Sequence, residues 1–180
     1  FLVAGFFWAT STPGESYSGP VANPHSPMLA ERLEQHVTTL ARSPRNLKQA
    51  KTILTTLTYL TGELESYGYA VERQEVVAPA DNLIVRLEAS RPDAPILIVG
   101  AHYDTAGASP GADDNASGVA ALLELAQLLI DLNGSANAEV LLVFYANEEP
   151  PHFKTAAMGS FVHAQSLEVP EHVIGMISLE

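Results

Sequence analysis

Three apolar segments of the sequence each end on residues that can bind a metal ion. Residues 96–101 run into His102-Tyr103-Asp104-Thr105, residues 139–146 into Asn147-Glu148-Glu149, and residues 174–179 into Glu180. In open α/β sheets, ligands bind beyond the carboxyl ends of the strands. A histidine and several carboxylates at that edge would form a cluster suited to a divalent metal ion.

A further acidic motif, Gly111-Ala112-Asp113-Asp114-Asn115-Ala116-Ser117-Gly118, lies between the first two segments. A carboxylate has two oxygens, so it can bridge two metal ions a few ångströms apart. Asp and Asn are also common at turns and at helix N-caps. Taken alone, the motif therefore leaves a structural and a metal-binding role equally open.

The other two motifs are also ambiguous in isolation. A neutral imidazole is a good zinc ligand, and a carboxylate two residues away can fix its tautomer, but a His102–Asp104 pair alone is more often structural. The adjacent Glu148 and Glu149 point in different directions, so one can bind metal while the other acts on water as a general base. An isolated Glu-Glu pair is also typical of an exposed acidic loop.

The four motifs together resemble one family. Their order, H-Y-D-T, G-A-D-D-N-A-S-G, N-E-E and I-G-M-I-S-L-E, is similar to that of the co-catalytic di-zinc aminopeptidases, with family-like separations over residues 82–180. That family includes bacterial leucyl aminopeptidases, aminopeptidase Y-like enzymes and their glutaminyl cyclase relatives. The resemblance implies a peptide substrate and two zinc ions per intact catalytic domain.

The resemblance also implies a role for each residue of the motifs. Asp114 would bridge the two zinc ions, with the Asp114–Asn115 peptide bond in the cis form. His102 and Glu180 would complete the set around one ion, Glu180 standing where the family usually has Asp. Glu149 would bind the other ion. Glu148 would be the general base and acid, Asp104 would orient His102, and Ser117-Gly118 would begin the helix behind the bridging loop.

The sequence departs from the family pattern in the remaining ligand. The family supplies one more histidine to the Glu149 ion, downstream of the last motif, and we expect that residue after Glu180. His152, His163 and His172 do not occupy the family position, and we interpret them as surface or local structural residues. The chain thus resembles the N-terminal portion of a compact zinc peptidase domain, without a protease-associated insert. The expectation is that this portion alone is poor in metal.

Composition excludes several kinds of site and partner. The chain has 180 residues, is 47% hydrophobic and carries a formal net charge of −12. Nucleic-acid binding needs clustered Lys and Arg, so no nucleic-acid partner is expected. The absence of cysteine excludes disulfides and thiolate zinc sites, which leaves His and carboxylate ligands for any metal. The sequence does not indicate an oligomeric state or a side-chain specificity.

Residues 1–27 are predicted to form an apolar start followed by an arm rich in Pro, Ser and Gly, and residues 28–180 the catalytic portion. Residues 1–9 are too few to span a bilayer, which takes roughly 20 residues. They could be the remnant of a secretion signal, or of a membrane anchor that begins upstream of residue 1. A core strand or a swapped arm is the alternative. We expect an exported, periplasmic or membrane-anchored protein, and a cytoplasmic one is not excluded.

The elements that would position the motifs follow from periodicity and from Pro and Gly signals. Helices are predicted for about residues 26–41, 44–67, 116–132 and 156–165, and strands for 70–77, 82–88, 96–101, 140–146 and 174–179. Strands that alternate with helices indicate an α/β fold with a mostly parallel central sheet and helices on both faces. This is the three-layer sandwich of the zinc exopeptidases that the motifs resemble.

Three functions remain open from the sequence. The leading one is a metal-dependent aminopeptidase that hydrolyses the N-terminal peptide bond of peptides. The second is acyl transfer of the glutaminyl cyclase kind on the same scaffold, whose members usually keep a single zinc ion. The third is a non-catalytic binding domain with the peptidase fold, which the presence of every expected ligand up to Glu180 disfavours.

Overall fold

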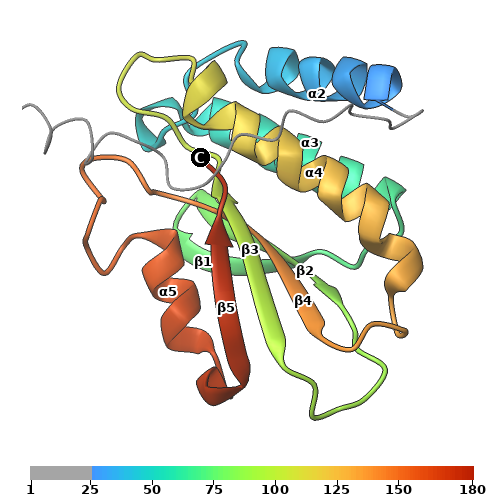
Figure 1. The fold of residues 1–180 in the computed structure, drawn as a ribbon. Coiled ribbons are helices and arrows are strands. Elements are labelled where there is room, and N and C mark those ends of the chain that lie inside the picture. Colours follow the sequence, from blue (N-terminus) through green and yellow to red (C-terminus); the bar gives the residue numbers. More distant parts are fainter. Residues whose placement is uncertain (1–25) are drawn as a thin grey trace, which may run out of the picture.

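A computed structural model describes residues 26–180 (Figure 1). The apolar start and nearly all of the predicted arm therefore lie outside the described residues. The longer helices are α2 (Ser26–Leu40), α3 (Ala50–Ser66), α4 (Ser117–Leu129) and α5 (Gly159–Ser166). Short helical turns are η1 (Leu47–Gln49), η2 (Ala112–Ala116), η3 (Ile130–Leu132) and η4 (Pro170–His172). The strands are β1 (Glu72–Val77), β2 (Ala80–Leu87), β3 (Ile96–His102), β4 (Glu139–Tyr145) and β5 (Val173–Ser178).

The strands form one sheet in the order β1-β2-β4-β3-β5. β3 is parallel to β4 and to β5, whereas β1–β2 and β2–β4 are antiparallel pairs. The predicted α/β fold is confirmed, but only β3, β4 and β5 are parallel to one another. A parallel connection needs a crossover of about a dozen residues or more. The turns before β2 and before β3 contain no helix, so the chain reverses there, while α4 and α5 supply the crossovers to β4 and β5.

Helices cover both faces of the sheet, as predicted (Figure 1). α2, α3 and α4 lie together on one side, and α5 lies on the other. Alternate residues of β4 show why both faces are covered: Leu142 and Phe144 pack in the larger core with α3 and α4, and Leu141 and Val143 in a smaller core with Leu167. Strands buried on both faces have continuous apolar sequences, and this pattern predicts β3 and β4.

The helix starts differ from prediction in two places. The second helix begins at Ala50 and not at Pro44, because residues 44–46 are a loop and η1 follows. The last helix begins at Gly159 and not at Ala156. By contrast, α2 starts at Ser26 as the Ser-Pro signal predicted, and Gly68 ends the second helical segment with a φ of 102°.

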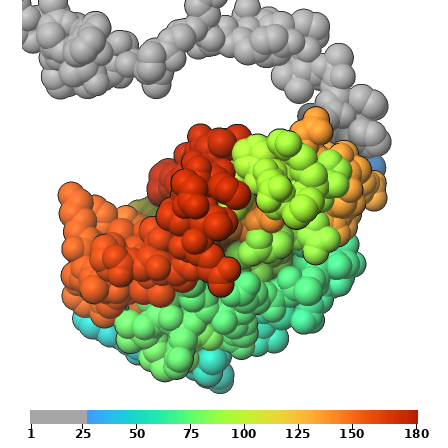
Figure 2. All heavy atoms as spheres, turned by 90° about the horizontal axis from the view of Figure 1, so that it is seen from below, coloured from blue at the N-terminus to red at the C-terminus, as the bar shows by residue number. Residues whose placement is uncertain are grey.

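α4 is the central helix of the larger core. The segment Ala112–Leu132 is apolar and long enough to cross a membrane, but half of its most apolar stretch is buried within the molecule. Its contacts with α2, α3, β3 and β4 make it a core helix of the layer that covers the sheet. Seen from below in Figure 2, the red segment that leads into β5 lies beside the yellow-green segment that leads into β3, in agreement with the pairing of β3 and β5.

Candidate metal centre

His102 and Glu180 reach the same edge of the sheet because β3 and β5 are parallel and in register. Gly100 is the pairing partner of Ser178, and each lies two residues before one of these side chains. A hydrogen bond from Leu179 N to Gly100 O, 2.8 Å long, extends the pairing past the end of β5. His102 is itself paired with Tyr145, the last residue of β4, so Glu148 follows at the same edge.

Three of the predicted metal ligands converge there. His102 Nε2 lies 3.0 Å from Asp114 Oδ1 and 3.4 Å from Glu180 Oε2. One ligand atom from each of the three residues lies within 4.8 Å of the other two. His102 is buried, whereas the side chains of Asp114 and Glu180 are 64% and 63% exposed, so the group is open to solvent on one side.

Asn115 holds the loop of Asp114 against the end of β5. The Asp114–Asn115 peptide bond is cis, as the resemblance implied. The buried Asn115 side chain donates to Leu179 O over 2.7 Å and accepts a hydrogen bond from Gly118 N over 2.9 Å. A Cβ atom on Gly118 would lie 2.3 Å from Asn115 Oδ1, so this close approach requires glycine. These contacts connect the loop of Asp114 to the segment that carries Glu180.

Asp104 connects His102 to the Glu148-Glu149 loop. Its Oδ1 and Oδ2 accept hydrogen bonds from the backbone N–H groups of Glu148 and Glu149, at 2.9 and 3.0 Å. Asp104 Oδ1 also lies 3.4 Å from His102 Nδ1, which is buried and forms no hydrogen bond among the described residues. Asp104 therefore stands behind the imidazole, on the side away from Asp114 and Glu180, as expected for an orienting residue.

The crowding of carboxylates shifts the pKa values of the site. Burial lowers the pKa of His102, but Asp104, Glu148 and Glu180 raise it more, to about 9. The pKa of Glu148 is raised by burial first and then by Asp104, Glu180 and Asp114. A carboxylate whose pKa is raised towards neutrality is suited to accept and release a proton.

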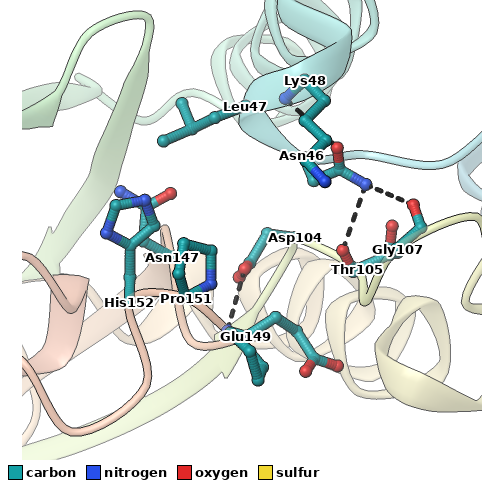
Figure 3. Close-up of a pocket in the computed structure, with 11 residues that line it drawn as sticks. Asn46, Leu47, Lys48, Asp104, Thr105, Gly107, Asn147, Glu149, Pro151 and His152 are labelled. Atoms are coloured by element: carbon teal, nitrogen blue, oxygen red, sulfur yellow. Dashed lines mark hydrogen bonds between the residues drawn. The ribbon is translucent and has the colours of Figure 1, made fainter.

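A cavity of about 280 Å³ lies beside Asp104 and Glu149 (Figure 3), and a second one of about 450 Å³ is lined by His102, Glu148 and Glu180. Asp104, Asn147 and Glu149 line one part of the smaller cavity, and the Pro150-Pro151-His152 loop and the segment Asn46–Lys48 line the rest. His152, which we interpreted as a surface or local structural residue, lines the smaller of these cavities, while His163 is buried and faces Tyr145 Oη at 3.1 Å.

The donor set of one imidazole nitrogen and two carboxylate oxygens fits a zinc ion. Ligand bonds of about 2.0–2.1 Å in tetrahedral geometry place neighbouring donor atoms roughly 3.4 Å apart. The separations from His102 Nε2 to Asp114 Oδ1 and Glu180 Oε2, 3.0 and 3.4 Å, match that spacing. Glu149, predicted to bind a second ion, does not join this three-residue group and instead lines the smaller cavity.

Comparison with known proteins agrees with this arrangement. The model of peptidase family M28 matches residues 82–171, which is half of the chain and covers the first three motifs. The chain belongs to peptidase family M28. The uncharacterized protein YfbL of Escherichia coli K12 is 40% identical over 174 residues, which cover 88% of this chain and 52% of YfbL. The chain thus spans about half the length of this curated relative.

Solved structures with the same fold include aminopeptidases and a glutaminyl cyclase. The LapA aminopeptidase of Legionella pneumophila has a TM-score of 0.68 at 18% identity, over 93% of this chain and 48% of LapA. Two structures from Bacteroides thetaiotaomicron, a leucine aminopeptidase precursor and a glutaminyl cyclase bound to N-acetylhistamine, each have a TM-score of 0.60 at 26% identity. Each of these covers 83% of this chain and 59% of the solved chain.

Two residues that shape the M28 site were not singled out from the sequence. For Asn115 the sequence predicted only its place in the acidic motif and in the cis peptide bond, although its position beside Asp114 was a signal for a supporting role of its side chain. Arg45 is fully buried and bonded to the loops of the site, and nothing in its Pro-flanked segment predicts this.

Proposed function

We propose that this chain forms part of a zinc-dependent aminopeptidase that hydrolyses the N-terminal peptide bond of peptides. The observation that carries the proposal is the convergence of His102, Asp114 and Glu180 on ligand atoms within 4.8 Å of one another. Family membership supports the reaction class, since M28 is a peptidase family. The aminopeptidase descriptions of the solved relatives support action at the amino end.

The residues would divide the work as follows. His102, Asp114 and Glu180 would hold one zinc ion, and Asp114 with Glu149 would contribute to a second. When bound, such ions supply a Lewis acid for the scissile carbonyl and lower the pKa of water. Glu148 would take a proton from the attacking water and pass it to the leaving amine, and Asp104 would hold both the imidazole and the Glu148 backbone in place.

The exposed carboxylates favour a substrate with a free amino group. Asp113, Asp114 and Glu180 are all exposed beside the same loop, and the whole chain carries a net charge of −12. A positively charged α-ammonium group would be attracted to this end of the molecule. The cavity of about 450 Å³ that is lined by His102, Glu148 and Glu180 provides space for the peptide next to the metal ligands.

Acyl transfer of the glutaminyl cyclase kind is the second candidate. It is favoured by one observation: the glutaminyl cyclase and the leucine aminopeptidase precursor from B. thetaiotaomicron match this chain equally well. Parallel assays of the full-length protein with a leucyl anilide and with a glutaminyl substrate separate the two functions. Anilide hydrolysis without cyclisation supports the aminopeptidase, and the reverse result supports the cyclase.

The substitution Glu148→Gln tests the proposed mechanism. Because Glu148 acts on the proton and does not bind metal, we expect activity to fall by about 10²- to 10⁴-fold while zinc content stays at the wild-type level. Activity is measured by leucyl anilide hydrolysis and zinc content by elemental analysis. Near-wild-type activity, or loss of zinc with the activity, would show that Glu148 has been given the wrong role.

A further inference from the structure

Arg45 is the largest fully buried side chain in the described part of the molecule, with a relative exposure of 0%. It lies in the loop between α2 and η1. A buried guanidinium group is costly unless its N–H groups are hydrogen-bonded. The hydrogen-bond partners of the guanidinium group therefore indicate the role of this buried charge.

The Arg45 side chain bonds only to backbone carbonyl groups among the described residues. Nε donates to Tyr103 O at 2.7 Å, and Nη1 donates to Leu40 O and Pro110 O at 2.7 Å each. Nη2 donates to Gly111 O at 2.9 Å. Within this part of the chain no carboxylate forms a direct ion pair with Arg45, so its direct contacts connect backbone segments.

Three of the four bonded carbonyls belong to the two segments that carry the proposed metal ligands, and the fourth, Leu40 O, lies at the end of α2. Tyr103 lies between His102 and Asp104, and Gly111 lies three residues before Asp114. The Arg45 backbone adds two bonds to the first segment, since its N–H donates to Thr105 Oγ1 at 2.8 Å and its carbonyl accepts from Thr105 N at 2.9 Å. One residue thus connects the His102 segment to the Asp114 loop.

Gly111 shows how closely this connection is packed. Its φ of 58° is one that residues with a side chain rarely adopt. A Cβ atom at Gly111 would lie 2.3 Å from Asp114 O, 2.4 Å from Thr105 Cγ2 and 3.1 Å from Arg45 Nη2. The backbone carbonyl of Asp114 and the Arg45 guanidinium therefore both lie close to this glycine.

We propose that Arg45 is a positioning residue of the metal centre, which sets the spacing between His102 and Asp114 through the carbonyls of Tyr103, Pro110 and Gly111. The inference rests on the proposed function, because it requires that these two side chains bind metal. Arginine suits the role because its donors form a rigid planar fork, while a lysine ammonium offers three donors from a single point. A lysine at this position can satisfy only some of the four carbonyls.

The test compares zinc binding by the full-length wild-type protein, Arg45→Lys and Arg45→Met. Zinc affinity is measured by competition with a chelator, and the site geometry by the visible absorption spectrum after cobalt substitution. Loss of groups that orient metal ligands typically lowers metal affinity about 10- to 100-fold. We expect a loss of that size with an altered cobalt spectrum for Arg45→Met, and a smaller loss for Arg45→Lys.

Leu57→Ala is the matched control, since Leu57 is a buried residue of α3 in the core under the sheet. It should lower the melting temperature of the metal-free protein while leaving zinc affinity and the cobalt spectrum unchanged. If Arg45→Met does not fold, Arg45→Lys decides the question. Wild-type zinc affinity and spectrum in a folded Arg45 variant would reduce Arg45 to a stabilising residue and overturn the inference. Failure of the wild-type protein itself to bind zinc would instead overturn the proposed function.

Discussion

Asp104→Asn tests the hydrogen bonds by which Asp104 connects the Glu148-Glu149 loop to the segment of His102. The two side chains have the same shape, but asparagine has one carbonyl oxygen where aspartate has two carboxylate oxygens. In the wild type, both oxygens of the buried Asp104 accept hydrogen bonds, one from Glu148 N and one from Glu149 N. In the variant, an NH2 group would face one of these N–H donors.

The size of the effect follows from those two contacts. A hydrogen bond to a charged group contributes about 1.5–3 kcal/mol, and a buried donor left without a partner costs about 1–3 kcal/mol. We expect the free energy of unfolding of the metal-free protein to fall by about 2–4 kcal/mol. For a domain of this size that corresponds to a melting temperature lower by roughly 5–15 °C. Zinc affinity should fall about 10- to 100-fold, because the imidazole loses its orienting carboxylate.

Thermal unfolding followed by circular dichroism, with and without a chelator, measures the first effect, and chelator competition measures the second. Asp113→Asn is the control, because it makes the same change of charge at an exposed side chain that has no hydrogen bond among the described residues. An Asp104→Asn protein that melts at the wild-type temperature and binds zinc normally would refute the role given to Asp104.

Two further predictions concern packing and pH. Gly118→Ala should destabilise the protein by about 1–3 kcal/mol and weaken zinc binding, because the new Cβ would lie 2.3 Å from Asn115 Oδ1 and 2.7 Å from Leu179 O. Gly62→Ala is its control, because nothing lies within 4 Å of a Cβ atom at Gly62. In chemical denaturation the control should be as stable as the wild type or more stable. An equal loss of stability in both variants would disprove the packing argument. Burial lowers the pKa of His163 in the folded state below its ordinary value of 6.5. At acidic pH the unfolded chain therefore binds more protons than the folded one, and the stability of the protein falls as the pH drops through and below 6.5. His163→Gln should reduce that fall when denaturation is measured at several pH values, and an unchanged pH dependence would exclude His163 as its source.

The central strands and the residues at their ends could be predicted from the sequence. The apolar runs before His102 and before Asn147 are β3 and β4, and both are buried on two faces. Parallel strands present their carboxyl ends at one edge, so the sequence also predicted that His102 and Glu180 would meet there. The resemblance added the position of Asp114 and the cis bond that follows it.

The antiparallel half of the sheet and the role of Arg45 could not be predicted in the same way. The apolar pattern of a strand does not predict which strand it pairs with. Only the absence of a helix from the turns before β2 and before β3 indicates that the chain reverses direction there. Arginine is rarely buried, so an arginine after Ser43-Pro44 reads as exposed. Its partners Tyr103 and Gly111 lie 58 and 66 residues away, a separation over which local patterns carry no signal.

The most direct test of the account is a crystal structure of the full-length protein with zinc, with anomalous diffraction data collected at the zinc absorption edge. The proposal predicts one anomalous peak among His102 Nε2, Asp114 and Glu180, and a second peak between Asp114 and Glu149. A single peak at the His102 group would reduce the centre to one ion, as in the cyclase alternative. Zinc bound elsewhere, with no peak at His102, would contradict the proposed metal centre.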